Sequence, residues 1–188
     1  ESTKRALARL GATKAPSRVM TMVLDNRAAG RLVGALLGPL SASALQQRRS
    51  FLEGRKGESI GSPLLQLTDD PLVPRGLGSR HFDGEGLSAK RLPLFENGVL
   101  KSYYVDTYYG RKLGLPPTTG STSNVSWNLG ERDARALIAE ASSGVFVTGF
   151  LGGNSNGTTG DYSLGVQGFM IRNGQVAEPV AEMNISGN

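Results

Sequence analysis

The sequence predicts an α+β fold with a mostly antiparallel sheet, and three observations lead to this class. Glycine occupies 26 of the 188 positions and hydrophobic residues make up 38%, which favours turns and strands over long helices. Asn97-Gly98 and Asn173-Gly174 each separate two apolar runs, and Asn-Gly supplies the two positive-φ positions of a tight hairpin turn. The predicted strands and helices do not alternate regularly, so we expect hairpins with segregated helices.

The N-terminal part is predicted to hold a helix and a strand. Residues 3–10 have the apolar spacing of a short amphipathic helix, which Ser2 or Thr3 can cap and Gly11 can end. Residues 19–24 form an uninterrupted apolar run of strand length, so we expect a strand that is buried on both faces.

One long packed helix is predicted near residues 27–52. Apolar residues recur there at helical spacing, at Ala29, Leu32, Val33, Leu36, Leu37 and Leu40. Glycine also recurs every fourth residue, at Gly30, Gly34 and Gly38, which predicts a face that packs closely against the sheet. Gly38-Pro39 should break or kink this helix, and Ser41 or Ser43 can cap its second part.

The rest of the chain is predicted to be rich in hairpins and loops. We expect strands at 64–68 and 144–151, helices at 107–113 and 131–141, loops at 53–62, 76–86 and 115–129, and hairpins pairing 91–95 with 99–105 and 168–172 with 175–180. We expect a single α+β domain over residues 1–188. Because the chain lacks an initiator Met and a signal peptide, we read it as a segment of a longer protein.

Composition excludes several classes of function. There is no cysteine, which removes disulfides and thiolate chemistry, and no apolar run reaches the roughly 18 residues that a membrane span needs. The single imidazole, His81, gives no set of zinc ligands, so we expect no metal and no cofactor. The net charge of +5 raises the question of nucleic-acid binding. Aromatic residues are few and are not interleaved with the basic ones, so we expect a solvated basic face instead.

Two motifs suggest chemistry of their own, and each also has a purely structural explanation. The run from Gly152 to Thr159 nearly fits a phosphate-binding loop, but Thr158 stands at the lysine position and no helix follows, so we do not expect nucleotide binding. The small polar residues from Asn154 to Ser163 either tie this loop down by local hydrogen bonds or present donors to a ligand. A lone loop histidine such as His81 is usually solvated, although a stand-alone hydrolase that uses it is not excluded by the sequence.

Several stretches together resemble the TldD/PmbA family, known as modulators of DNA gyrase and as peptidases. They are Gly76-Leu77, Phe82 to Gly86, Asn97 to Leu100, Arg111 to Gly114, Thr159 to Gly165, Gly168 to Ile171, Asn173-Gly174, Pro179-Val180 and Glu182 to Asn188. The resemblance runs from about Arg18 to the last residue. It implies that the chain matches part of the family's C-terminal domain, with an N-terminal domain before it and further C-terminal sequence after it.

The resemblance also implies that a metal site has been lost. Active members carry His-Glu-x-x-x-His on a helix that resembles residues 27–45, where the two histidines bind zinc and the glutamate acts as a general base. These positions hold Gly30, Arg31 and Ala35 here. Glycine and alanine have no donor atom, and Arg31 places a positive charge where the cation would lie. The chain is therefore similar to the PmbA branch, also called TldE.

From that branch we expect a non-catalytic, cytoplasmic bacterial subunit that pairs with a TldD-like zinc peptidase to process unstructured peptides. A peptide can add a strand to a sheet edge through main-chain hydrogen bonds. We expect the loop from Gly157 to Ser163 and its neighbour to line the peptide cleft or to contact the partner, with Asn156, Thr159, Gly160, Asp161, Tyr162 and Ser163 as the binding residues.

Two alternatives from other classes stay open. The chain could regulate DNA gyrase or a toxin–antitoxin pair by binding without proteolysis, through its basic face. It could also be the stand-alone hydrolase that uses His81 or residues 154–163. Self-association is also expected, because a segment without its flanks leaves apolar surface uncovered.

Overall fold

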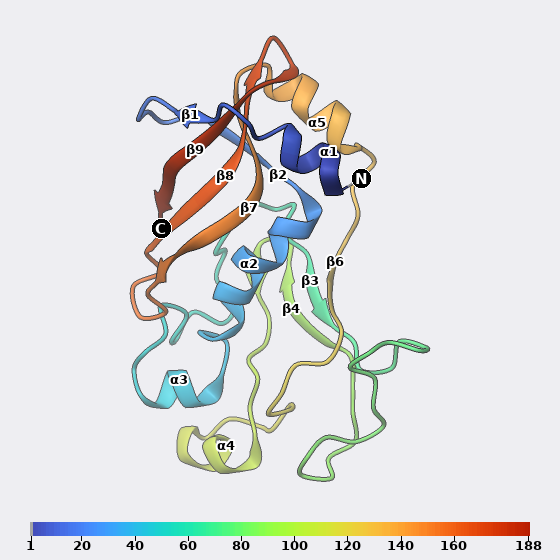
Figure 1. Cartoon of the computed structure of the whole chain (residues 1–188). Coiled ribbons are helices and arrows are strands. Elements are labelled where there is room, and N and C mark those ends of the chain that lie inside the picture. The colour runs from blue at the N-terminus through green and yellow to red at the C-terminus, as the bar shows by residue number, and fades with distance from the viewer. Residues whose placement is uncertain (1) are drawn as a thin grey trace. The chain divides into compact units, whose positions relative to one another are not determined.

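A computed structural model describes residues 2–188, and Figure 1 shows its elements along the chain. The chain divides into two compact units, one formed by residues up to 35 together with 130–188 and the other by residues 36–129. The boundary falls inside a helix, and each unit is described by itself. The predicted single domain over residues 1–188 stays a prediction, whereas the α+β class is confirmed.

The first unit is built on a five-stranded sheet in the order β1-β9-β8-β7-β2. Its elements are α1 (Ser2–Leu7), β1 (Thr13–Lys14), β2 (Thr21–Leu24), α2 (Asn26–Leu37, which crosses the boundary), α5 (Ala134–Ala141), β7 (Gly144–Ser155), β8 (Tyr162–Arg172) and β9 (Gln175–Gly187). The long strands β7, β8 and β9 pair antiparallel, and the short strands β1 and β2 pair in parallel at the two edges. The mostly antiparallel sheet is as predicted.

The predicted Asn-Gly hairpin joins β8 to β9. Asn173 and Gly174 have φ values of 50° and 71°, the positive pair that such a turn requires. Strands β8 and β9 on either side of the turn are longer than predicted. Strand β7 is also longer, because it continues to Ser155 through a region that the sequence marks as a glycine-rich loop. Register shifts beside Gly149 and Gly152 let the pairing with β8 continue across those glycines.

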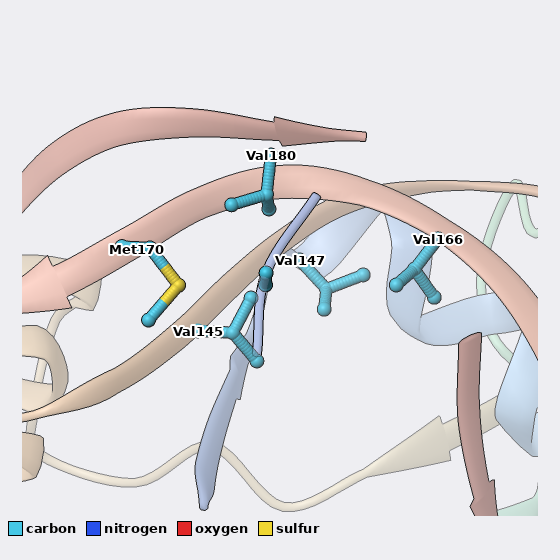
Figure 2. Close-up of a cluster of buried hydrophobic side chains, with 6 residues drawn as sticks. Val145, Val147, Val166, Met170 and Val180 are labelled. Atoms are coloured by element: carbon cyan, nitrogen blue, oxygen red, sulfur yellow. The ribbon is translucent and has the colours of Figure 1, made fainter. Parts of the chain in front are cut away.

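Each face of this sheet carries its own apolar cluster. On one face Val23 and Ile171 pack with Ile138 of α5. Side chains from three long strands meet on the other face, and Figure 2 shows Val145, Val147, Val166, Met170 and Val180 turned toward one another. Val147 and Val166 there have no exposed surface, so this cluster contributes strongly to the stability of the sheet.

All four methionines of the chain belong to this second cluster. Met170 lies in its buried centre, and Met20, Met22 and Met183 pack around it from the strands and from the segment that precedes β2. Beside them lies a hollow of about 600 Å³, lined by residues 14–20, Met22, Val145, Tyr162 and residues 182–186. Methionine fills such irregular space well because its side chain is unbranched and flexible.

Two expectations for the N-terminal elements need correction. The strand over residues 19–24 is shorter, and Val23 alone of β2 is buried, because β2 lies at the sheet edge and one side of it has no neighbouring strand among the described residues. The prediction that Gly30, Gly34 and Gly38 pack closely against the sheet is wrong, since a Cβ added to any of them would meet no atom within 4 Å. The predicted helix at 3–10 is present as the shorter α1, which spans Ser2–Leu7 and gives way to a turn before Gly11.

The long helix near residues 27–52 is broken where Gly38-Pro39 predicted a break. Ser41 caps α3 (Ala42–Gln46), and its hydroxyl accepts a hydrogen bond from the Ala44 N–H. The second part ends well before residue 52, because Arg48 adopts a positive φ of 53° that a helix cannot contain. Within residues 2–188, no helix has the length and apolar character to cross a membrane.

The second unit holds a four-stranded sheet in the order β5-β4-β3-β6. Its elements are α3, β3 (Leu67–Asp69), β4 (Leu92–Glu96), β5 (Val99–Leu100), α4 (Thr107–Leu113) and β6 (Val125–Trp127). The helix over 107–113 has the predicted bounds, with Asp106 as its N-cap and Gly114 in the left-handed conformation at its end. The strand predicted over 99–105 ends early, because Tyr104 pairs with Leu40 and Ala42 instead.

A buried carboxylate ties the second unit together. Asp69 at the end of β3 is 1% exposed, and it accepts hydrogen bonds from the Tyr104 hydroxyl (2.8 Å) and from the Ser123 N–H (2.8 and 3.0 Å) and hydroxyl. Burial raises the pKa of Tyr104, and the hydrogen bond to Asp69 raises it further, so the phenol remains a donor. Because these donors are distant in sequence, the carboxylate holds three segments in place.

The Asn97-Gly98 turn between β4 and β5 predicts how a glycine substitution changes the stability of the second unit. Gly98 has a φ of 77°, and a Cβ there would collide with the main-chain oxygens of Gly61 and Ser62. Gly98→Ala should therefore lower the free energy of unfolding by more than about 2 kcal/mol. The matched control is Gly114→Ala, where φ is 67° and the Cβ would meet no atom within 4 Å, so its loss should be about 1 kcal/mol. Urea denaturation would compare them, and equal losses would contradict the crowding at Gly98.

Candidate functional site

The positions of the expected metal motif lie on α2, and their side chains cannot bind a metal. Gly30 and Arg31 are exposed and Ala35 is half-buried. Glycine and alanine offer no donor atom, and a guanidinium stays positively charged at any working pH. Among residues 2–188 no group of three or more His, Cys, Asp or Glu is close enough to hold an ion. The residues present at these positions do not fit zinc.

A groove lies beside this face of α2. It has a volume of about 320 Å³ and is lined by Arg27, Ala28 and Arg31 of α2 and by residues 148–152 of β7. Figure 1 shows α2 running beside the second half of β7. All of the lining residues belong to the first unit. Sequence inspection missed this groove, because Arg27 and residues 148–152 belong to no recognisable motif.

The β7 wall of the groove is an open sheet edge. The four residues of β2 pair only with Gly144 to Val147, and the N–H of Asp25 makes the next contact, 2.9 Å from the Val147 oxygen. The chain then turns into α2. Beyond Val147, no strand in residues 2–188 pairs with this side of β7, which continues to Ser155. Such an edge presents main-chain donors and acceptors to an incoming strand.

The electrostatics of the groove are positive. Arg27 contacts Asp25, with Nε 3.2 Å and Nη2 3.4 Å from its carboxylate oxygens. Burial acts to raise the pKa of Asp25, but hydrogen bonds from Arg27 and the charges of Arg27 and Arg5 hold that pKa below its usual range. Asp25 therefore balances Arg27. No carboxylate partner is recorded for Arg31 among the described residues, so Arg31 supplies the net charge of the groove.

The predicted binding residues gather just beyond the end of β7, in and next to the loop that leads to β8. Asn156 and Asp161 are joined through their main chains (2.7 Å), and the Asn156 oxygen accepts the Gly160 N–H (2.8 Å). The Thr159 hydroxyl donates to the Asp161 carboxylate at 2.6 Å, and the Asn188 amide donates to it at 2.7 Å. These polar groups tie the loop down by local hydrogen bonds, which is one of the two explanations that the sequence allows.

The remaining predicted binding residues, Tyr162 and Ser163, begin β8 next to the loop. The Ser163 hydroxyl lies 3.3 Å from that of Ser186 on β9, and the ring of Tyr162 lies where a Cβ on Gly187 would be. The structure thus brings the predicted residues together with the end of β9. Ser163 also lines a hollow with Leu151 and Gly152, two residues that the groove beside α2 shares.

His81, the basis of the hydrolase alternative, lies exposed in the second unit. Its main-chain oxygen accepts from Ala89 at 2.9 Å. Its imidazole has no recorded hydrogen bond to a serine, threonine or carboxylate among the described residues. The arrangement of a nucleophile activated by a base is therefore not formed around His81 in this structure.

Comparison with known proteins gives a consistent result. The family model described as the PmbA/TldA metallopeptidase C-terminal domain matches residues 17–188. Metalloprotease PmbA of Escherichia coli O157:H7 is 30% identical over 98% of this chain and 42% of its own length. A Methanothermobacter thermautotrophicus metalloprotease is 32% identical over 98% of this chain and 43% of its own.

Solved structures share the fold as well. The crystal structure of a proposed modulator of DNA gyrase from Bacteroides thetaiotaomicron covers 99% of this chain and 43% of its own, with a TM-score of 0.96 and 42% identity. TldE from Thermococcus kodakarensis covers 98% of this chain and 46% of its own, with a TM-score of 0.81 and 26% identity. The chain therefore spans less than half the length of the relatives that it matches.

The hydrogen bonds of the loop predict a titration result. Donation from Thr159 and Asn188 holds the pKa of Asp161 below its usual range. A carboxylate with a lowered native pKa adds stability at pH values above its unfolded pKa, and that stability is lost as the pH falls through the native pKa. Thr159→Val should raise the Asp161 pKa measured by NMR. Thr158→Val, the same change at a neighbour whose hydroxyl makes no hydrogen bond within residues 2–188, should leave it unchanged. A shift with both variants would contradict this assignment.

Proposed function

Because the chain belongs to the PmbA/TldD metallopeptidase family, we propose that it is a subunit without a zinc site, which pairs with a TldD-type zinc peptidase to process unstructured peptides. On its own such a subunit does not hydrolyse peptides. Its contribution is to bind the substrate, the partner or both, while the partner supplies the metal and the general base.

One observation supports this proposal above the others. The family resemblance matches α2 to the helix that carries zinc ligands in active relatives, and it assigns Gly30, Arg31 and Ala35 to the motif positions. The helix is intact and exposed there, so the loss concerns ligand atoms and not the scaffold. A cation next to Arg31 would meet like charge without a compensating donor, which is unfavourable. The family likeness of the whole segment is kept while its metal chemistry is removed.

Peptide binding is supported by the open edge of β7. Main-chain hydrogen bonds along a sheet edge do not depend on the side chains of the bound peptide, which suits an unstructured substrate of varied sequence. The loop residues Asn156, Thr159, Gly160, Asp161, Tyr162 and Ser163 are proposed as a second contact, with the peptide or with the partner subunit. Their local hydrogen bonds give the loop a defined shape for such a contact.

The names of the relatives support a second candidate function. Several relatives are called metalloproteases, and the Bacteroides thetaiotaomicron structure is called a proposed modulator of DNA gyrase. A regulatory protein that binds gyrase, or a toxin–antitoxin pair, without proteolysis is favoured by the net charge of +5, because a basic surface attracts acidic partners. Such association should weaken strongly with added salt. A cytoplasmic location and self-association stay predictions.

The companion role predicts that an unfolded peptide is cleaved quickly only when this protein and its TldD-type homologue are both present. The full-length protein, its TldD-type homologue and an unfolded peptide are mixed, and cleavage is followed by mass spectrometry. We expect no cleavage by this protein alone and at least several-fold faster cleavage by the pair than by the homologue alone.

Elemental analysis of the separately purified protein completes this test, with an expected zinc content far below one ion per chain. If the pair cleaves no faster than the homologue, the companion role is wrong. Stoichiometric zinc held by residues of α2, or hydrolysis without the homologue, would contradict the loss of the metal site. If the pair is inactive but the protein binds gyrase in a salt-sensitive manner, the regulatory candidate replaces it.

A further inference from the structure

We propose that the groove between α2 and the open edge of β7 binds the C-terminal carboxylate of an extended peptide, with Arg31 as its principal ligand. This inference rests on the proposed function, because peptide processing provides chains with free ends. It adds a specificity that the family assignment does not contain: the subunit would select chain ends over internal segments.

The charges of the groove point to a carboxylate. Among residues 2–188, Arg27 and Arg31 are the only charged residues that line it, and no acidic side chain of this described part does so. Asp25 lies close by, but it is engaged by the main chain of Arg27 at 2.9 Å and by the Arg27 side chain. Arg31 therefore carries an uncompensated charge and a planar set of donors that matches a carboxylate. A peptide ammonium group would be repelled.

The sheet geometry points to the end of a chain. A peptide that adds to β7 beyond Val147 follows the same edge that β2 already occupies up to Leu24, so it cannot continue past that point. It must end or turn away beside the first turns of α2, where the arginines lie. The volume of about 320 Å³ is at the small end of ligand pockets, which suits a terminus better than a long segment.

These constraints also set the direction of the bound peptide. Its carboxylate lies at the Val147 end of the open edge and its preceding residues extend toward Ser155, so it runs antiparallel to β7. Antiparallel pairing continues the pattern of β7, β8 and β9. Gly149 and Gly152 carry no side chain at two positions of this stretch, which permits close approach of another backbone there.

The test uses a short unstructured peptide of glycine, serine and alanine with a fluorophore at its N-terminus. Three forms are compared by fluorescence anisotropy with the full protein: a free C-terminal carboxylate, a C-terminal amide, and an amide with an internal aspartate. We expect the free carboxylate to bind at least about tenfold more tightly than either amide, because a charge-assisted bidentate contact is lost in both.

Arg31→Gln should remove this preference, and Arg31→Lys should retain part of it, because lysine keeps the charge but not the fork. The matched control is Arg111→Gln on α4, an exposed arginine in the other unit that also changes the net charge by one and should keep the full preference. Circular dichroism would verify that each variant is folded.

Several outcomes would overturn the inference. One is an equal affinity of the protein for the free-carboxylate peptide and for either amide peptide, with or without the internal aspartate. The others are a carboxylate preference that survives Arg31→Gln and an absence of measurable binding of the free-carboxylate peptide. The cleavage assay of the pair is independent of these results. If the pair cleaves peptides but shows no carboxylate preference, only this inference fails, whereas carboxylate binding without faster cleavage would leave the groove assigned and remove the companion role.

Discussion

The antiparallel pairing of β7, β8 and β9 is the constraint on which the first unit depends. These strands are 12, 11 and 13 residues long, while β1 and β2 at the edges have 2 and 4 residues. The edge strands therefore cover only a part of their neighbours. The mismatch turns the chain into α2 just after Leu24 and leaves the second half of β7 open. Without the long pairing there would be neither an edge nor a helix placed beside it.

The same arrangement is compatible with the proposed absence of a zinc site. The position of α2 is set by β2 and by the buried residues Ala28 and Val33, and none of these contacts requires a metal ligand. Replacing donor side chains by glycine and alanine on the exposed face leaves that packing untouched. Arg31 on this helix lines the groove beside β7, and the proposed ligand of the groove is accordingly an anion and not a cation.

Local backbone conformation could be predicted from the sequence, whereas the pairing of distant strands could not. The two Asn-Gly turns, the bounds of the helix over 107–113 and the break at Gly38-Pro39 were predicted because each depends on the conformational preference of one or two residues. The lengths of β7 and β8 were underestimated, since their glycines suggested a loop and only cross-strand partners reveal the bulges. The groove was missed because it joins α2 to residues more than a hundred positions away. The lost ligands at Gly30, Arg31 and Ala35 were visible only through the family resemblance.

The gathering of Met20, Met22, Met170 and Met183 on one face of the sheet has a consequence for chemical durability. Methionine is oxidised to a sulfoxide, which is polar and chiral and disrupts apolar packing. Met20, Met22 and Met183 are partly exposed beside the hollow, so an oxidant reaches them before it reaches Met170. Damage would therefore concentrate on a single layer of the protein, and enzymes that reduce methionine sulfoxide could restore it while the outer thioethers remain accessible. The absence of cysteine leaves these sulfur atoms as the sole thioether or thiol targets of the chain.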